Sequence, residues 1–262
     1  MFDTWLTYAD IGQLGGPSGS DVAVMVAFAL VAGLARGFSG FGAALIFMPV
    51  ASALVGPKSA AAILWFIDTT MSLPMLPGAW RLSDKKQVGF MLAGAVIGLP
   101  LGTAVLTYSD PLALRWAIVV LVIGLLGLLV SGWRYGGAPK PPLTAGVGAL
   151  SGIFAGAAQV GGPPVIAYWL GGYLPANLVR ANIIIYFGLS SVLSGVNYGL
   201  AGILTVKTAA LALAAAPAYA IGLKAGSAGF RLAEETLFRR ICYGLIATAV
   251  IIGLPILDPV LR

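Results

Sequence analysis

The sequence contains no histidine, a single cysteine (Cys242) and few charges, which make up 9% of its 262 residues. Without histidine it offers no His-ligated zinc, haem or copper and no Ser-His or Cys-His pair, and one cysteine forms no disulfide within the chain. Acidic pairs with D-x-x-D spacing, which would suit a Mg²⁺-dependent lipid enzyme, are also missing. We therefore expect that the protein is not an enzyme and that it binds no metal and no cofactor.

Hydrophobic residues make up 59% of the chain, and the mean hydropathy is +0.97. Average globular chains carry about 25% charged residues, so a soluble domain of this size would lack the charge to cover its surface. The composition predicts an integral membrane protein whose partner is the lipid bilayer. The net charge of +6 fits topology-setting loops better than nucleic acid, because no basic patch with interleaved aromatics is present.

Two of the hydrophobic blocks are too long for one crossing, since a straight span needs about 20 residues. They cover residues 21–56 and 144–175, and each is interrupted near its middle by a glycine-rich break. We expect each to be a pair of short helices. The other blocks lie at 59–78, 86–107, 112–133, 178–201, 205–229 and 237–257.

The pattern of blocks repeats along the chain. Gly33 and Gly37 align with Gly152 and Gly156, and the offset between matching motifs stays between 119 and 124 residues. Each half crosses the membrane an odd number of times, so the second half is inverted relative to the first. The sequence predicts an all-α, polytopic transmembrane bundle of two inverted repeats, each starting with a glycine-interrupted helix pair. The predicted parts are a first repeat at 21–133, a cytoplasmic linker at 134–143 and a second repeat at 144–257.

Basic residues in the loops predict the orientation. With both termini outside, the inner loops hold the larger set of Lys and Arg, as the positive-inside rule requires. The inner set is Arg81, Lys85, Lys86, Arg134, Lys140, Arg180, Arg231, Arg239 and Arg240, and the outer set is Lys58, Arg115, Lys207 and Arg262. We expect a multi-pass protein of the cell inner membrane with extracytoplasmic termini.

The two breaks, GFSGFG at Gly37–Gly42 and AQVGGPP at Ala158–Pro164, are the first candidates for a binding site. Irregular backbone at membrane depth must be buried in protein or line a cavity. A helix that begins there presents unpaired N–H groups and a positive dipole end, which bind anions. The substrate-binding residues predicted from the breaks are Ser39, Gly40, Gly42, Gln159, Gly161 and Gly162. Glycines such as Gly94, Gly98 and Gly102 instead suit close helix packing.

Asp68 and Arg36 are the charged candidates. A carboxylate at mid-helix is costly in lipid, so Asp68 should face the interior. It is either a proton carrier coupled to the substrate, a partner for a buried arginine, or a cap for a kink near Pro74. Arg36 precedes the first break, and it either holds an anion bidentately or anchors the cytoplasmic end of its helix.

The block 178–201 holds weaker candidates. Arg180 either anchors the helix at the inner face or attracts anions to a vestibule. Asn182 and Tyr186 are further substrate-binding candidates. A polar stripe follows, read as cavity-facing or as hydrogen bonds between helices: Tyr186, Ser190, Ser191, Ser194 and Asn197.

Two motifs carry a family resemblance: G-F-x-G-x-G-x-x-L-x-x-x-P from Gly37 to Pro49, and S-G-x-x-A-G-x-x-Q-x-G-G-P-P from Ser151 to Pro164. With the continuation through Arg180 and Asn182 to Tyr186, the chain resembles the TauE/SafE family of sulfite exporters. The resemblance implies a carrier of sulfite, sulfonates or related organosulfur anions. The first break departs from a run of consecutive glycines, which leaves the packing of that half-site open.

We therefore expect an alternating-access carrier of a small organosulfur anion. A carrier or channel for another small anion, such as a carboxylate, is the alternative, and a homodimer stays open. An anion inside the negative cell is pushed outward by about 2.3 kcal/mol per charge per 100 mV. Export needs no coupling, whereas import would need a cation or proton, for which Asp68 is the candidate.

Overall fold

The computed structural model describes residues 17–39, 41–171, 174–229 and 235–261, and these contain helices and no β-strand. The predicted all-α class is confirmed. Seven helical segments of the described residues are long and apolar enough to cross a membrane. They are Gly19–Phe38, Pro57–Leu82, Lys85–Tyr108, Pro111–Ser131, Pro141–Ala158, Asn177–Leu200 and Val206–Gly229. The sequence stretches 1–16 and 262, on which the placement of the termini depends, lie outside the described residues.

Each of the two long hydrophobic blocks forms a helix pair. In the first, α2 (Gly19–Ser39) is followed by α3 (Ala43–Val55); in the second, α8 (Pro141–Ala158) is followed by α9 (Gly162–Trp169). α2 and α8 are longer than the expected short helices, because they have 21 and 18 residues and reach spanning length. α3 and α9 have 13 and 8 residues, about 20 Å and 12 Å of helix, so each is too short to cross.

The next helix of each half follows its short helix. α4 (Pro57–Ser72) continues through the 3-10 turn η1 (Leu73–Met75) into α5 (Leu76–Leu82), so the span is interrupted at Pro74, near the predicted kink. In the second half the corresponding helix is α10 (Ala176–Leu200), which packs against α4, α5 and α6.

The remaining helices of the first half start at carboxylate caps. α6 (Lys85–Tyr108) follows Asp84, whose side chain accepts hydrogen bonds from the backbone N–H groups of Lys86 and Gln87. α7 (Pro111–Ser131) follows Asp110 in the same way. A side-chain acceptor at this position stabilises a helix by about 1 kcal/mol.

The second half ends with α11 (Val206–Gly229) and α12 (Glu235–Gly253), followed by the 3-10 turn η2 (Pro255–Leu257) and α13 (Asp258–Leu261). Asp258 forms a two-pronged ion pair with Arg115 at the start of α7, with N–O distances of 2.6 and 2.9 Å. Both side chains are largely buried, so this pair ties the end of the chain to the first half.

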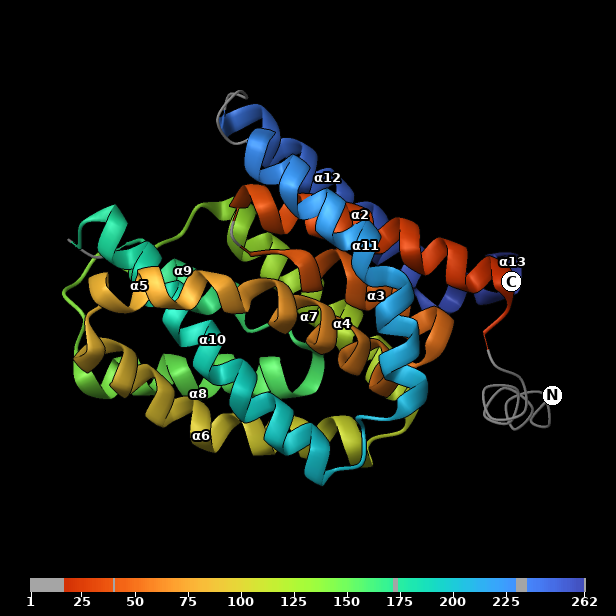
Figure 1. The fold of residues 1–262 in the computed structure, drawn as a ribbon, viewed down its shortest axis with the longest axis horizontal. Helices are drawn as coiled ribbons and strands as arrows, with labels where there is room; N and C mark the ends of the chain where they lie inside the picture. The colour runs from red at the N-terminus through yellow and green to blue at the C-terminus, as the bar shows by residue number, and fades with distance from the viewer. Residues whose placement is uncertain (1–16, 40, 172–173, 230–234, 262) are drawn as a thin grey trace.

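Two helix pairs form the closest contacts in the fold. α2 lies along α11, and α6 lies along α8 (Figure 1). Glycines make both contacts: a Cβ on Gly98 would overlap the Ala149 carbonyl oxygen, and a Cβ on Gly222 would overlap that of Leu30. Small residues bring helix backbones together in this way in membranes. The predicted packing role of Gly94, Gly98 and Gly102 fits these contacts, because each of them faces the backbone of α8.

Corresponding helices of the two halves make corresponding contacts across the molecule. The first helix of each half packs on the fourth helix of the other half, as α2 does on α11 and α8 on α6. The short helices α3 and α9 likewise contact α12 and α7, the last helices of the opposite halves. The core therefore consists of helices exchanged between the halves, with the two breaks enclosed among them.

Candidate functional site

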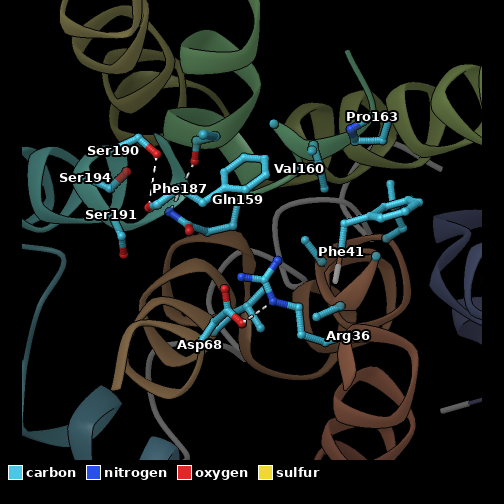
Figure 2. A pocket seen from close by; sticks show the side chains of 18 residues that line it. Arg36, Phe41, Asp68, Gln159, Val160, Pro163, Phe187, Ser190, Ser191 and Ser194 are labelled. Carbon is cyan, nitrogen blue, oxygen red and sulfur yellow. Dashed lines mark hydrogen bonds and ion pairs between the residues drawn. The ribbon is translucent and has the colours of Figure 1, made fainter. Parts of the chain in front are cut away.

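A cavity of about 70 Å³ lies where the two breaks meet. Its wall comes from both halves of the chain and includes α2, α3, α4, α8, α9 and α10. Figure 2 shows Arg36 and Asp68 pointing toward each other on one side of this cavity, with Gln159 and Phe187 facing them from the second half. Arg36 and Asp68 are the charged side chains among the described residues that line it.

The N-termini of both short helices open into the cavity. α3 begins after Gly42, which adopts a left-handed backbone with φ of 94°, and Gly42, Ala43 and Ala44 all line the wall. α9 begins after Gly161, and Gly161 and Gly162 lie opposite. The first N–H groups of a helix have no partner within the helix, and the helix dipole adds about half a positive charge there. The start of α9 offers fewer such N–H groups than that of α3, because its second and third residues, Pro163 and Pro164, have none. The cavity is therefore electropositive at two places without any side chain.

Arg36 and Asp68 form an ion pair inside this cavity, with 3.0 Å between Nε and Oδ1. The Tyr219 hydroxyl of α11 donates to the same Asp68 oxygen at 2.6 Å. Arg36 also donates to the Ser72 hydroxyl at 3.3 Å, and its guanidinium carbon lies 6.0 Å from the centre of the Phe187 ring. Asp68 is thus the partner of a largely buried arginine, one of the three roles that the sequence left open, and it also lies in the cavity wall.

Gln159 forms the turn of the second break. Its backbone has φ of 58°, the one positive value at a described residue other than glycine. Its side-chain Nε2 donates to the Ala155 carbonyl at 3.2 Å and to the Tyr198 hydroxyl at 3.0 Å. Tyr198 in turn donates to the Gly156 carbonyl at 2.9 Å. These bonds hold the end of α8 in place and employ both amide hydrogens of Gln159.

Of the three weaker candidates, Tyr186 and Asn182 lie behind the wall and are not part of it. The Tyr186 hydroxyl donates to Ser151 at 3.0 Å, and Ser151 donates to the Gly161 carbonyl at 2.7 Å, so Tyr186 supports the second break from the rear. Asn182 is fully buried and accepts a hydrogen bond from the Asp84 backbone N–H at 2.7 Å, which joins α10 to the start of α6.

Arg180 is exposed and lies outside the wall, and Gly40 and the Ser39 side chain lie outside the described part of the chain. The cavity thus brings together Arg36, Gly42, Asp68, Gln159, Gly161 and Gly162 from the predicted set.

The hydroxyls of α10 form the other polar side of the cavity. Ser190, Ser191 and Ser194 line the cavity, which agrees with the cavity-facing interpretation of the polar stripe. Asn197 instead donates a hydrogen bond to the carbonyl of Leu193 in its own helix. Ser191 also exchanges a hydrogen bond with Thr69 across the α4–α10 contact.

Two aromatic rings complete the wall, and the sequence analysis did not single them out. Phe41 lies in the first break, and Phe187 follows Tyr186 on α10. The spacing between the two halves could have pointed to both rings. Most lining residues fall into pairs 119 positions apart, which is the offset that relates Gly33 to Gly152, so a residue of one half indicates its counterpart in the other. The pairs are Arg36 and Ala155, Phe41 and Val160, Gly42 and Gly161, Ala43 and Gly162, Ala44 and Pro163, and Asp68 and Phe187.

A multi-pass helical membrane protein with a polar, partly charged cavity between interrupted helices has the architecture of a membrane transporter. Residues 25–253 match the family model described as Sulfite exporter TauE/SafE, so the chain belongs to the TauE/SafE family. The resemblance seen in the sequence is confirmed, and the family is one of transporters. Comparison of the chain with curated proteins and with solved structures found no match.

Proposed function

We propose that the protein is a carrier that moves a small organosulfur anion, such as sulfite or a sulfonate, by alternating access through the cavity between the two breaks. The observation that carries this proposal is the meeting of two helix N-termini and Arg36 in one cavity. Each of these groups favours a negative guest, and their effects add in a poorly hydrated site. A carboxylate carrier or an anion channel would use the same cavity and is the alternative.

The size of the cavity favours a small substrate. A buried water needs about 10–15 Å³ of such volume. The 70 Å³ observed therefore accommodate about five water-sized groups. Sulfite and methanesulfonate have four and five non-hydrogen atoms and fit this range, whereas pockets for drug-sized ligands measure about 300–1,000 Å³.

The paired wall residues and exchanged helix contacts support the inverted repeat that alternating access needs. Six lining pairs share one offset, and the helix contacts of one half have counterparts in the other. In such carriers two similar halves rock around a fixed site, which opens the site to either side in turn. On this proposal the protein lies in the cell inner membrane with both termini outside, and it acts as a transporter and not as an enzyme.

A filled-cavity variant tests the site. A Cβ on Gly162 would lie 3.6 Å from Phe41 and 4.0 Å from Phe187, so this position tolerates a side chain that occupies the cavity. We expect Gly162→Leu to reach the membrane and fold but to lose anion binding. Gly146→Leu is the control, because Gly146 is exposed on α8 and a Cβ there meets nothing within 4 Å.

Binding is measured by thermal melting of the purified protein with sulfite, methanesulfonate, thiosulfate or acetate. A ligand at 100 times its Kd stabilises the native state by about 2.7 kcal/mol, which raises the Tm by roughly 5–10 °C. Wild type and Gly146→Leu should show this shift and Gly162→Leu should not. An equal shift in Gly162→Leu, or no shift with any of the four anions, would refute the proposed site.

Transport in proteoliposomes separates the carrier from the channel. Saturable uptake and counterflow of labelled anion indicate a carrier, and single-channel currents indicate a channel.

A further inference from the structure

The Asp68 carboxylate forms an ion pair with Arg36 in the cavity where an anionic substrate would bind. We propose that Asp68 is a resident counter-ion: the substrate replaces it on Arg36, Asp68 takes up one proton, and one proton therefore travels with each singly charged anion. This inference rests on the proposed function, since it assumes that the anion binds in the cavity beside Arg36.

The geometry brings the Asp68 carboxylate and the proposed anion to the same guanidinium. Arg36 Nε lies 3.0 Å from Asp68 Oδ1, and its NH2 group donates to Ser72 at 3.3 Å. The side chain of Arg36 is 16% exposed and that of Asp68 31%, and both line the cavity. Figure 2 shows Asp68 beside the guanidinium of Arg36, so an anion that binds this guanidinium lies next to the carboxylate.

Charge balance favours uptake of the proton. In the empty cavity the side-chain charges of Arg36 and Asp68 sum to zero, so a singly charged anion would leave one negative charge opposed only by the partial positive charges of the two helix starts, which is unfavourable in a partly buried site. Protonation of the Asp68 carboxylate to the neutral acid restores zero net charge. Arg36 keeps its own proton and exchanges one negative partner for another, so no other group has to change its charge.

The surroundings of Asp68 suit both of its states. Arg36 faces it from α2 and Tyr219 from α11, and the Tyr219 hydroxyl donates to Oδ1 whether or not the carboxyl group is protonated. Ser72 from its own helix contacts its arginine partner, and no further ionisable side chain of the described residues lines the cavity. After protonation, the new O–H of Asp68 is a donor for the bound anion.

This exchange predicts a distinct form of transport. The anion and its proton carry no net charge together, so the membrane potential should not drive the flux. A pH gradient should drive it instead, with anion accumulating on the alkaline side. In Asp68→Asn the proton site is lost while the neutral charge balance of the loaded cavity is kept, so the anion should still bind but should move as a charge.

The experiment measures protons taken up as methanesulfonate binds to the purified protein in weakly buffered solution between pH 5 and 8. Methanesulfonate keeps one negative charge throughout this range. Wild type should take up one proton per anion at the alkaline end and Asp68→Asn none, and the wild-type Kd should rise tenfold per pH unit there. Asp110→Asn is the control: Asp110 caps α7 at an exposed position outside the cavity, so this variant should match the wild type.

A second measurement uses proteoliposomes with an imposed potassium diffusion potential. The potential should leave wild-type flux unchanged and accelerate or reverse flux through Asp68→Asn. Binding by wild type without proton uptake overturns the inference while the proposed function stands, and this result needs no variant. Equal proton uptake by wild type and Asp68→Asn also overturns it. If sulfite is the anion that binds, sulfite itself can exchange a proton with the solution. This contribution is the same for both proteins, so subtracting the proton uptake of Asp68→Asn from that of the wild type removes it. Absence of binding to the wild type refutes the proposed function itself.

Discussion

Alanine at Gly98 tests whether close helix contact, and not merely the presence of α6 and α8, stabilises the structure. The Cβ that Gly98→Ala adds would overlap the Ala149 carbonyl oxygen of α8. Because that atom belongs to the backbone, no side-chain rotation relieves the overlap, and the helices must separate. Glycine at Gly94 and Gly102 makes the same contact one turn away on either side, so separation there would weaken these contacts too.

The magnitude follows from a matched substitution on the same helix. Replacing glycine with alanine in a helix interior stabilises the helix by roughly 0.5–1 kcal/mol. Gly89→Ala on α6 should show this gain alone, since a Cβ at Gly89 meets nothing within 4 Å. Gly98→Ala has the same gain but also costs about 1–3 kcal/mol through overpacking. The difference between the two variants is therefore about 1–3 kcal/mol.

Thermal melting of the purified protein measures this difference. A change of 1 kcal/mol shifts the Tm of a chain of this size class by about 2–4 °C, so Gly98→Ala should melt on the order of 5 °C below Gly89→Ala. Gly222→Ala should fall by a similar amount, because its Cβ would overlap the Leu30 carbonyl oxygen in the corresponding α2–α11 contact. Equal melting of Gly98→Ala and Gly89→Ala would show that the helices adjust freely and would refute the reasoning.

Two further predictions concern the second break and the end of the chain. Both Gln159→Ala and Gln159→Gly lose the Nε2 hydrogen bonds, but glycine adopts φ of 58° without the left-handed penalty of about 1–2 kcal/mol, so Gln159→Gly should melt above Gln159→Ala. The reverse order would contradict this view of the turn. Arg115→Leu removes the two-pronged ion pair with the largely buried Asp258 and should cost about 3–5 kcal/mol, whereas the double variant with Asp258→Leu should recover most of the loss in the same melting assay. If the double variant melts no higher than Arg115→Leu, the ion pair between these two residues does not account for the loss of stability.

The two breaks followed from the sequence because glycine, proline and hydrophobic length have direct structural consequences. Gly42, Gly161 and Gly162 lie at the cavity where the sequence places them, and Arg36 and Asp68 join them there. The cost of a carboxylate in lipid was enough to predict that Asp68 faces the interior, whereas Arg36 was left open between an anion-binding role and a helix anchor. Their pairing with each other was not predictable, because it depends on how α2 and α4 are oriented about their axes.

The same limit explains the residues of α10. Successive residues of a helix are rotated by about 100°, so a polar stripe defines a face but not what that face contacts. Phe187, Ser190 and Ser194 face the cavity, while Asn182 and Tyr186 face the start of α6 and the rear of the second break. Choosing between these faces requires the positions of the neighbouring helices, which local sequence does not contain.

Among the described residues, the charged side chains of the cavity come from the first half of the chain only. Arg36 and Asp68 correspond to Ala155 and Phe187 at the shared offset, and all four residues line the wall. On the proposed function the cavity between the two halves holds one anion, for which one guanidinium and its counter-ion suffice. A second Arg–Asp pair at the mirrored positions would add two charges to be desolvated and would fill the space beside the first pair. The backbone parts of the site, the two helix starts, are retained in both halves because they cost no buried side-chain charge. On the proposed function, the helix starts of both halves therefore supply the electropositive backbone frame, and the difference between the halves at these two positions supplies the single ion pair.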